Sequence, residues 1–192
     1  MTPLKIQGQL DKGWTLFLDR DGVVNEEIIG SYVTEWDEFV FCEGALDAIR
    51  TLSDIFGRIV IVTNQRGVGR GIMSLEALKN IHTNMVAAVE EAGGHLDKVY
   101  ACTAVADNDH NRKPNTGMAN QAREDFSEID FRRSVMVGNS MSDMEFGKRL
   151  AMHTVFLTTK HEPVELPHDL VDEQYNSLLS WAKALAAAEM VG

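Results

Sequence analysis

Two aspartates, Asp19 and Asp21, follow directly after an apolar run and lead into a glycine turn. The run Leu16–Leu18 predicts a buried strand, and Gly22 predicts the turn. Ligands of open α/β sheets bind at the carboxyl ends of the strands. A carboxylate there can act as a nucleophile or metal ligand, and a second one nearby can handle a proton. An ordinary turn explains the pair alone equally well, because Asp and Gly are common turn residues.

A second polar group follows the apolar run Ile59–Val62. The hydroxyl of Thr63 can donate to a phosphoryl oxygen, and the glycines after it allow backbone N–H groups to approach an anion. Arg66 and Arg70 offer forked contacts to a second anionic group. A flexible glycine loop with solvated arginines is the alternative interpretation.

Basic and metal-ligating residues stand at two further places along the chain. Lys113 can neutralise both a nucleophilic carboxylate and the phosphate that it attacks, and Arg112 can make a forked contact to substrate. After the apolar run Val135–Val137, Asn139 and Asp143 offer the oxygen ligands that Mg²⁺ prefers. Taken singly, these are ordinary solvated loop residues and a helix-start acid.

The elements that must position these residues alternate along the chain. Strands are predicted at Leu16–Leu18, Arg58–Thr63, Lys98–Ala101, Ser134–Val137 and Thr154–Thr158. Helices are predicted around Ala45–Leu52 and Leu78–Val89, the latter capped by Ser74, and at Gly117–Phe126, Ser142–Leu150 and Ser177–Met190. Lys160–Asp169 is predicted to be a loop. Strands separated by helices predict an α/β fold, a Rossmann-like parallel sheet with helices on both faces.

The composition fits one domain over residues 1–192, with a core at about 15–159 and a C-terminal helix at 176–190. The net charge of −11 argues against broad binding to nucleic acid or an anionic membrane. Two cysteines are too few for a disulfide framework, although one disulfide between them stays open. Without a signal peptide or a spanning segment, we expect a soluble cytoplasmic protein, a monomer or a weak homodimer.

The order of acid pair, hydroxyl, lysine and metal ligand resembles the haloacid dehalogenase superfamily, type IIIA, from about Thr15 to Thr159. Within it, the heptose bisphosphate phosphatases are the most similar branch, and the histidinol-phosphate phosphatases are close relatives. The motifs that carry this resemblance are Asp19–Asn25, Tyr32–Val33, Thr63–Gln65, Arg70–Gly71, Ile81–His82, Arg112–Pro114 and Gly117–Met118.

The resemblance implies a Mg²⁺-dependent phosphatase with an open site and a minimal cap. Its substrate would be a small phosphorylated metabolite, foremost D-glycero-D-manno-heptose 1,7-bisphosphate, which would lose the 7-phosphate. Asp19 would form a phosphoaspartyl intermediate, Asp21 would transfer the proton, Thr63 would orient the phosphoryl oxygens, and Lys113 would offset charge. The implied metal ligands are Asp19, Asp21, Asn139 and Asp143, and the implied substrate-binding residues are Asn64, Arg66, Arg70 and Arg112.

Two departures from the family pattern concern metals. Relatives usually have Gly-Asp where this chain has Gly138-Asn139, which removes one negative charge from the metal shell. We expect Mg²⁺ binding to persist through the Asn139 carbonyl oxygen and the Asp143 carboxylate. Many relatives also carry a loop of three cysteines and a histidine, of which only Cys102 remains here, with acids and His110 nearby. Since structural zinc needs four nitrogen or sulfur ligands, no zinc is expected.

Other functions stay open at this point. Histidinol phosphate is an alternative substrate, and the same motifs resemble the phosphatase domain of polynucleotide kinase phosphatases, which act on nucleic-acid 3′-phosphates. The acidic net charge counts against nucleic acid. From another class, Asn139 allows a non-catalytic phosphosugar-binding protein, which metal-dependent turnover would exclude.

Overall fold

Six parallel strands form one sheet in the order β3-β2-β1-β4-β5-β6. The computed structural model describes residues 6, 8–159 and 161–189. The strands are β1 (Thr15–Leu18), β2 (Arg58–Asn64), β3 (Lys98–Cys102), β4 (Ser134–Gly138), β5 (His153–Leu157) and β6 (Glu173–Tyr175). Leu18 at the end of β1 pairs with Ile61 of β2 and with Val137 of β4. The strand that carries the first aspartates therefore lies in the middle of the sheet.

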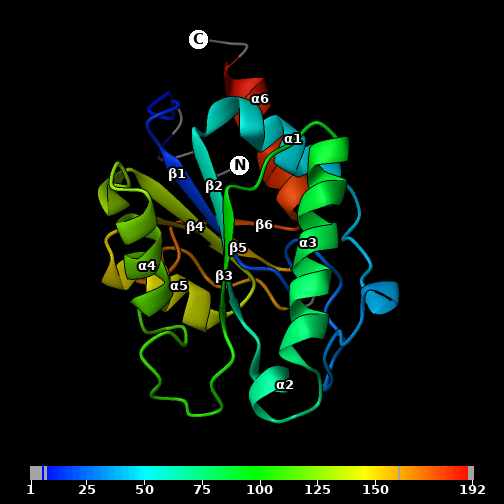
Figure 1. The fold of residues 1–192 in the computed structure, drawn as a ribbon. Helices are drawn as coiled ribbons and strands as arrows, with labels where there is room; N and C mark the ends of the chain where they lie inside the picture. The colour runs from blue at the N-terminus through cyan, green and yellow to red at the C-terminus, as the bar shows by residue number, and fades with distance from the viewer. Residues whose placement is uncertain (1–5, 7, 160, 190–192) are drawn as a thin grey trace.

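Helices cover both faces of this sheet (Figure 1). The long helices on one face are α1 (Ala45–Ile55), α3 (Leu75–Glu91) and α6 (Leu178–Glu189), and those on the other are α4 (Gly117–Asp125) and α5 (Met141–Arg149). Two 3₁₀ turns, η1 (Trp36–Glu38) and η2 (Phe131–Arg133), and the short α2 (Arg66–Gly69) complete the elements. The predicted α/β fold with two helical layers is confirmed.

The apolar runs form strands because the sheet is buried on both faces. All four residues of β1 and all five of β4 are buried, as expected for parallel strands under two helical layers. Ser74 caps α3 as predicted, since its hydroxyl accepts a hydrogen bond from the Ala77 amide at 2.9 Å. In α6, Trp181 is fully buried and its ring lies 6.1 Å from that of Phe56.

The structure differs from the sequence prediction in a few places. Strand β6 was not expected, and α2 forms one helical turn at Arg66–Gly69, where a glycine loop was expected. The last helix begins at Leu178, while the predicted end at Met190 lies outside the described residues. The predicted loop before it is irregular from residue 161 on, and Lys160 also lies outside the described residues. Cys42 and Cys102 are free thiols.

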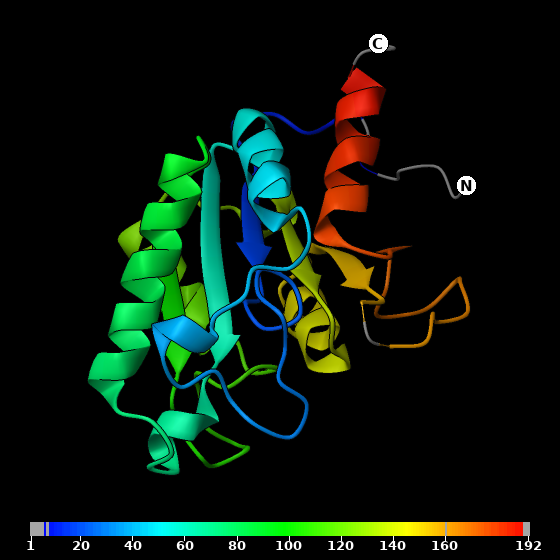
Figure 2. The same ribbon diagram turned by 90° about the vertical axis from the view of Figure 1, so that its right-hand side faces the viewer.

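The insertion between β1 and α1 crosses the carboxyl edge of the sheet (Figure 2), and its regular structure consists of the short turn η1 and two isolated bridges, Asp21–Asn25 and Asn25–Phe41. Figure 2 looks onto the face covered by α1, α3 and α6 and shows this insertion looping beneath the strand ends. The expected minimal cap is therefore confirmed. Within the part of the chain that the structure describes, no helix is both long and apolar enough to cross a membrane.

Candidate active site

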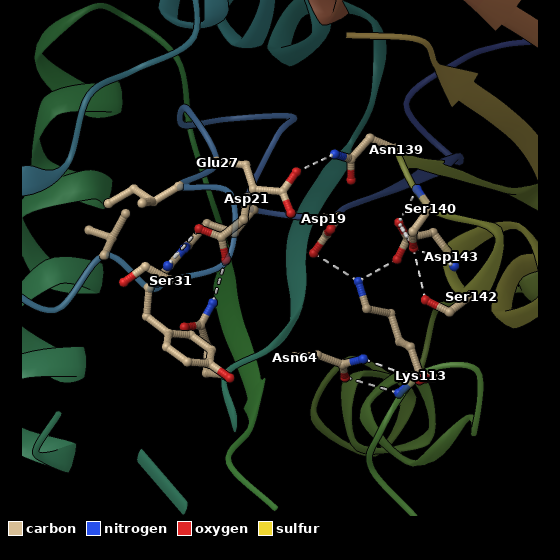
Figure 3. A pocket seen from close by; sticks show the side chains of 15 residues that line it. Asp19, Asp21, Glu27, Ser31, Asn64, Lys113, Asn139, Ser140, Ser142 and Asp143 are labelled. Atoms are coloured by element: carbon tan, nitrogen blue, oxygen red, sulfur yellow. Dashed lines mark hydrogen bonds and ion pairs between the residues drawn. The ribbon is translucent and has the colours of Figure 1, made fainter. Parts of the chain in front are cut away.

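A polar cavity of about 210 Å³ lies at the carboxyl edge of the sheet. The ends of β1, β2 and β4 and the loop after β3 form its wall, so segments far apart in the sequence meet there (Figure 3). Its lining includes six residues that the sequence predicts for the site, namely Asp19, Asp21, Asn64, Lys113, Asn139 and Asp143. The parallel topology thus collects the predicted carboxylates, the lysine and both amides into one place.

Asp19 stands immediately after β1 and continues its pairing with β4. Its amide donates to the Val137 carbonyl at 3.0 Å, and its carboxylate accepts a hydrogen bond from Lys113 Nζ at 2.8 Å. Burial, together with the nearby Asp143 charge, raises the pKa of Asp19 to about 7, although Lys113 opposes the shift. Any further positive charge in the cavity would therefore favour the ionised, nucleophilic form of Asp19.

The Lys113 ammonium bridges the two carboxylates. It lies 2.8 Å from Asp19 Oδ1 and 2.6 Å from Asp143 Oδ1. Burial alone would lower the pKa of Lys113, but the charges of Asp143 and Asp19 raise it above its ordinary value. The amide of Asn64 fixes the Lys113 backbone, because Oδ1 accepts from the Lys113 N–H at 3.0 Å and Nδ2 donates to its carbonyl at 3.1 Å. Asn64, predicted as a substrate contact, thus holds the lysine in place.

Asp143 lies in the first turn of α5 and belongs to a capping box with Ser140. Its Oδ2 accepts from the Ser140 backbone N–H at 3.0 Å and from the Ser140 hydroxyl at 2.7 Å. A Cβ at position 138 would lie 2.3 Å from Asp143 Cβ, so only glycine fits at the end of β4. Ser140 thus holds one oxygen of Asp143, and the other faces the Lys113 ammonium.

Asp21 is held by three donors that the sequence prediction of the site did not include. Arg20 Nη2 and Asn25 Nδ2 donate to its Oδ1 at 2.8 and 3.0 Å, and Gln65 Nε2 donates to its Oδ2 at 2.7 Å. Burial alone would raise the pKa of Asp21, but Arg20 and the two amides lower it below its usual range. Gln65 also donates to Thr63 Oγ1 at 2.8 Å; Thr63 is buried and does not line the cavity.

Asn139 places its amide between Glu27 and the cavity. Its Nδ2 donates to Glu27 Oε2 at 3.4 Å, and Figure 3 shows its oxygen turned toward Asp19. The Asn139 amide also lies close to Gly22, whose φ is +80°. Only glycine allows this close approach, since a Cβ at position 22 would lie 2.0 Å from Asn139 Nδ2. Glu27 thereby orients the Asn139 carbonyl oxygen toward the aspartates.

The cation that the sequence predicts would meet oxygen donors at this edge. They are the carboxylates of Asp19 and Asp143, the amide oxygen of Asn139 and, as the resemblance implies, the backbone carbonyl of Asp21; all four residues line the cavity. This set fits Mg²⁺, which is usually bound through one or two carboxylates and keeps several waters. In the described part of the chain, no group of three or more His, Cys, Asp and Glu side chains is arranged to hold a metal ion.

The three predicted substrate-binding arginines lie outside the cavity wall. Arg66 and Arg112 both form ion pairs with Asp107, whose side chain is 89% exposed; the Arg112 Nε to Asp107 distance is 3.5 Å. Arg70 Nη1 donates to the hydroxyl of Tyr32 at 3.2 Å, and Tyr32 lines the cavity. The structure therefore gathers two of the arginines around one acidic side chain beside the site.

Several residues of the site were missed by sequence reasoning. They are Arg20, Asn25, Glu27, Gln65, Ser140 and Ser142. Arg20, Asn25 and Gln65 stand inside or next to the motifs that were recognised, so their proximity to Asp19 and Thr63 was the available signal. Nothing in the sequence marks Glu27, because its contact with Asn139 joins positions 112 residues apart.

One family model and several known proteins are similar to this chain. The family model described as "Polynucleotide kinase 3 phosphatase" matches residues 18–162. The chain is 34% identical to the D-glycero-beta-D-manno-heptose-1,7-bisphosphate 7-phosphatase of Yersinia pestis, over 90% of this chain and 95% of that protein. It is 31% identical to the D-glycero-alpha-D-manno-heptose-1,7-bisphosphate 7-phosphatase of Mycobacterium bovis, over 91% of this chain and 93% of that protein.

Solved structures share the fold. The D,D-heptose 1,7-bisphosphate phosphatase of B. bronchiseptica, complexed with magnesium and phosphate, superposes with a TM-score of 0.79 at 26% identity, over 91% of this chain and 98% of that chain. Both the sequence and the architecture therefore lead to one assignment. The chain belongs to the polynucleotide kinase 3 phosphatase family and, like the heptose-1,7-bisphosphate 7-phosphatases that it resembles along most of its length, is a phosphatase of the haloacid dehalogenase superfamily.

Proposed function

We propose that this chain is a Mg²⁺-dependent phosphatase that removes the 7-phosphate of D-glycero-D-manno-heptose 1,7-bisphosphate. The observation that carries the chemistry is the position of Asp19, a buried carboxylate at the end of β1 whose oxygen lies 2.8 Å from the Lys113 ammonium. The names and magnesium complex of the relatives support the substrate and the cation.

The predicted catalytic residues of the cavity would divide the steps of this reaction among them. A carboxylate oxygen of Asp19 attacks phosphorus, the bond to the sugar oxygen breaks, and the phosphoryl group is carried on Asp19. The negative charge of a bound phosphate would oppose the lowering of the Asp21 pKa, so that Asp21 can give a proton to the departing oxygen. Asp21 later takes a proton from the water that cleaves the phosphoaspartate, which releases phosphate and restores Asp19. Lys113 offsets the repulsion between carboxylate and phosphate. Asp19, Asp21, Asn139 and Asp143 would hold Mg²⁺, which would supply further positive charge when bound.

The arginines outside the cavity give a reason to favour a substrate with two phosphates. Arg66 and Arg112 pair with the exposed carboxylate of Asp107, which is a weak partner because it is solvated. A second phosphate of the substrate would replace that carboxylate and make stronger forked contacts. A monophosphate of similar size would leave this interaction unused.

One observation favours a second substrate class. The matching family model is described by a nucleic-acid activity, the 3′-phosphatase of polynucleotide kinase. The net charge of −11 opposes this reading, since nucleic-acid binding rests largely on contacts between phosphates and basic side chains. The 3′-phosphorylated oligonucleotide is therefore the second candidate.

The test is phosphate release in the presence and absence of Mg²⁺, with both anomers of heptose 1,7-bisphosphate as substrates. Histidinol phosphate and a 3′-phosphorylated oligonucleotide serve as comparisons, and Asp19→Asn serves as the blank. We expect Mg²⁺-dependent release from a heptose anomer and none from the variant. Turnover of only another substrate would refute the heptose assignment, and normal turnover by Asp19→Asn would refute the nucleophile. Phosphosugar binding without release would support a non-catalytic protein.

The setting of this activity is also a proposal. We infer that residues 1–192 work as one phosphohydrolase domain in the cytoplasm, without zinc, as a monomer or weak homodimer. The continuous sheet from β3 to β6 supports the single domain. Sedimentation velocity and metal analysis of the purified protein test the size and the absence of zinc.

A further inference from the structure

Arg20, the residue between the two aspartates, contacts the second of them and His82. Its side chain is 1% exposed, and its two terminal nitrogens contact different partners. Nη2 donates to Asp21 Oδ1 at 2.8 Å, while Nη1 lies 3.2 Å from Nε2 of His82. The guanidinium therefore links the second aspartate of the motif to helix α3.

His82 occupies a rigid position on that helix. Its neighbours Ile81 and Met85 are fully buried in the core, so the backbone of α3 cannot shift there without disturbing the packing. Burial and the charge of Arg20 lower the pKa of His82 to about 3, so its ring is neutral. An arginine can only donate hydrogen bonds, and His82 Nε2 is therefore the acceptor.

The planar guanidinium of Arg20 couples the position of the His82 ring to the orientation of Asp21. Its nitrogens have fixed relative directions, so a ring that holds Nη1 also sets the direction from which Nη2 meets Asp21 Oδ1. Proton transfer depends on that direction, because a general acid must lie within hydrogen-bond reach of the departing oxygen. Small displacements of a catalytic group strongly reduce the rate of the reaction that it catalyses.

We propose that His82 is a positioning residue for Asp21, acting through the guanidinium of Arg20. The inference rests on the proposed function, since it assigns the role of a residue that supports the same reaction. It also makes α3 part of the catalytic apparatus, although the residues that line the cavity come from other elements.

A purely structural role of the Arg20–His82 pair makes a different prediction. If the pair only completes the core, its loss lowers the amount of folded enzyme and reduces turnover of every substrate by the same factor. If it positions Asp21, the loss depends on how much the departing group needs a proton. Phenolate is a poor leaving group, whereas 4-nitrophenolate leaves without protonation.

The experiment is a comparison of kcat/KM for phenyl phosphate and 4-nitrophenyl phosphate with saturating Mg²⁺. For this mechanism kcat/KM reports the steps up to release of the phenol, and the ratio of the two values in one preparation cancels any unfolded fraction. The variants are His82→Leu, which removes the acceptor, His82→Gln, which restores one, and Arg20→Lys, which keeps the charge without the fork. His95→Gln is the matched control, because His95 precedes β3 at the other end of the sheet.

For His82→Leu and Arg20→Lys we expect kcat/KM for phenyl phosphate to fall about tenfold or more, with less than about a twofold loss for 4-nitrophenyl phosphate. His82→Gln should recover most of the loss, and His95→Gln should match wild type. Equal losses on both substrates, or an unchanged ratio, would overturn the positioning role while leaving the proposed function intact. A wild-type protein inactive on these phosphates and on heptose bisphosphate would instead overturn the proposed function, and this role with it.

Discussion

Replacing Asp19 by asparagine should stabilise the protein while abolishing its activity. Asp19 is an ionisable group in a cavity that already holds the Asp143 charge, and the single ammonium of Lys113 serves both carboxylates. The folded-state pKa of Asp19, about 7, lies well above its ordinary value of 3.8. An ionised Asp19 is therefore less favourable in the folded protein than in the unfolded chain.

The sign and size of the effect follow from proton linkage. Between the two pKa values the folded state binds more protons than the unfolded state, so the free energy of unfolding falls as pH rises through this window and levels off above the folded value. The difference between 3.8 and about 7 corresponds to about 4 kcal/mol at most. The substitution also removes one of the two carboxylates that offset the Lys113 charge, and this loss cancels part of the gain in the free energy of unfolding. We therefore expect Asp19→Asn to raise the free energy of unfolding by about 2 kcal/mol or more at pH 8.

The assay is urea unfolding of wild type and Asp19→Asn at pH 4 and pH 8, with EDTA to remove divalent cations. We expect the free energy of unfolding of Asp19→Asn to exceed that of wild type clearly at pH 8 and hardly at all at pH 4, where Asp19 is protonated in the folded state. Asp54→Asn, on the exposed side of α1, is the control and should be neutral at both values. A variant that is less stable than wild type at pH 8 would refute the reasoning, because it would mean that Lys113 stabilises an ionised Asp19.

Three further substitutions follow from the site. Asn139→Asp should tighten Mg²⁺ binding about tenfold or more by adding a charged ligand, as measured by titration calorimetry; an unchanged affinity would place residue 139 outside the metal shell. Asp107→Asn should free the two arginines beside the cavity and lower KM for a bisphosphate about two- to fivefold, without changing KM for a monophosphate. Steady-state kinetics with both substrates measures the two KM values, and an equal change in both would contradict this expectation. Asn64→Ala should lower kcat about tenfold or more, because two hydrogen bonds to the Lys113 backbone are lost; an unchanged kcat would show that the lysine is held otherwise.

Much of the fold was predictable because its central strands are buried on both faces. Strands such as β2 and β4 are continuous apolar runs, and the predicted and observed ends differ by a residue or so. Strand β6 gave no such signal. It is three residues long and pairs only with β5 at the edge of the sheet, so its formation depends on tertiary contacts.

The site was predictable where its residues directly follow strands. Asp19, Asp21 and Asn139 meet in the cavity because parallel strands end at the same edge. The catalytic and binding roles assigned to them remain predictions. Pairings between side chains far apart in the sequence were not predictable, since Asp107 and His82, the distant partners of Arg66 and Arg20, lie 41 and 62 positions away in the chain. Such contacts depend on the path of each loop and on the packing of α3.

The central place of β1 has a consequence for how the enzyme is made. This strand is the first of the sheet to leave the ribosome, yet one of its two neighbours, β4, begins only at Ser134. Until β4 is synthesised, the backbone N–H and C=O groups on one edge of β1 lack their partners, and such an edge invites association with other chains. Pairings between distant segments also slow folding. We therefore expect early folding of the nascent chain, as well as the stability of the finished protein, to affect the yield of active enzyme.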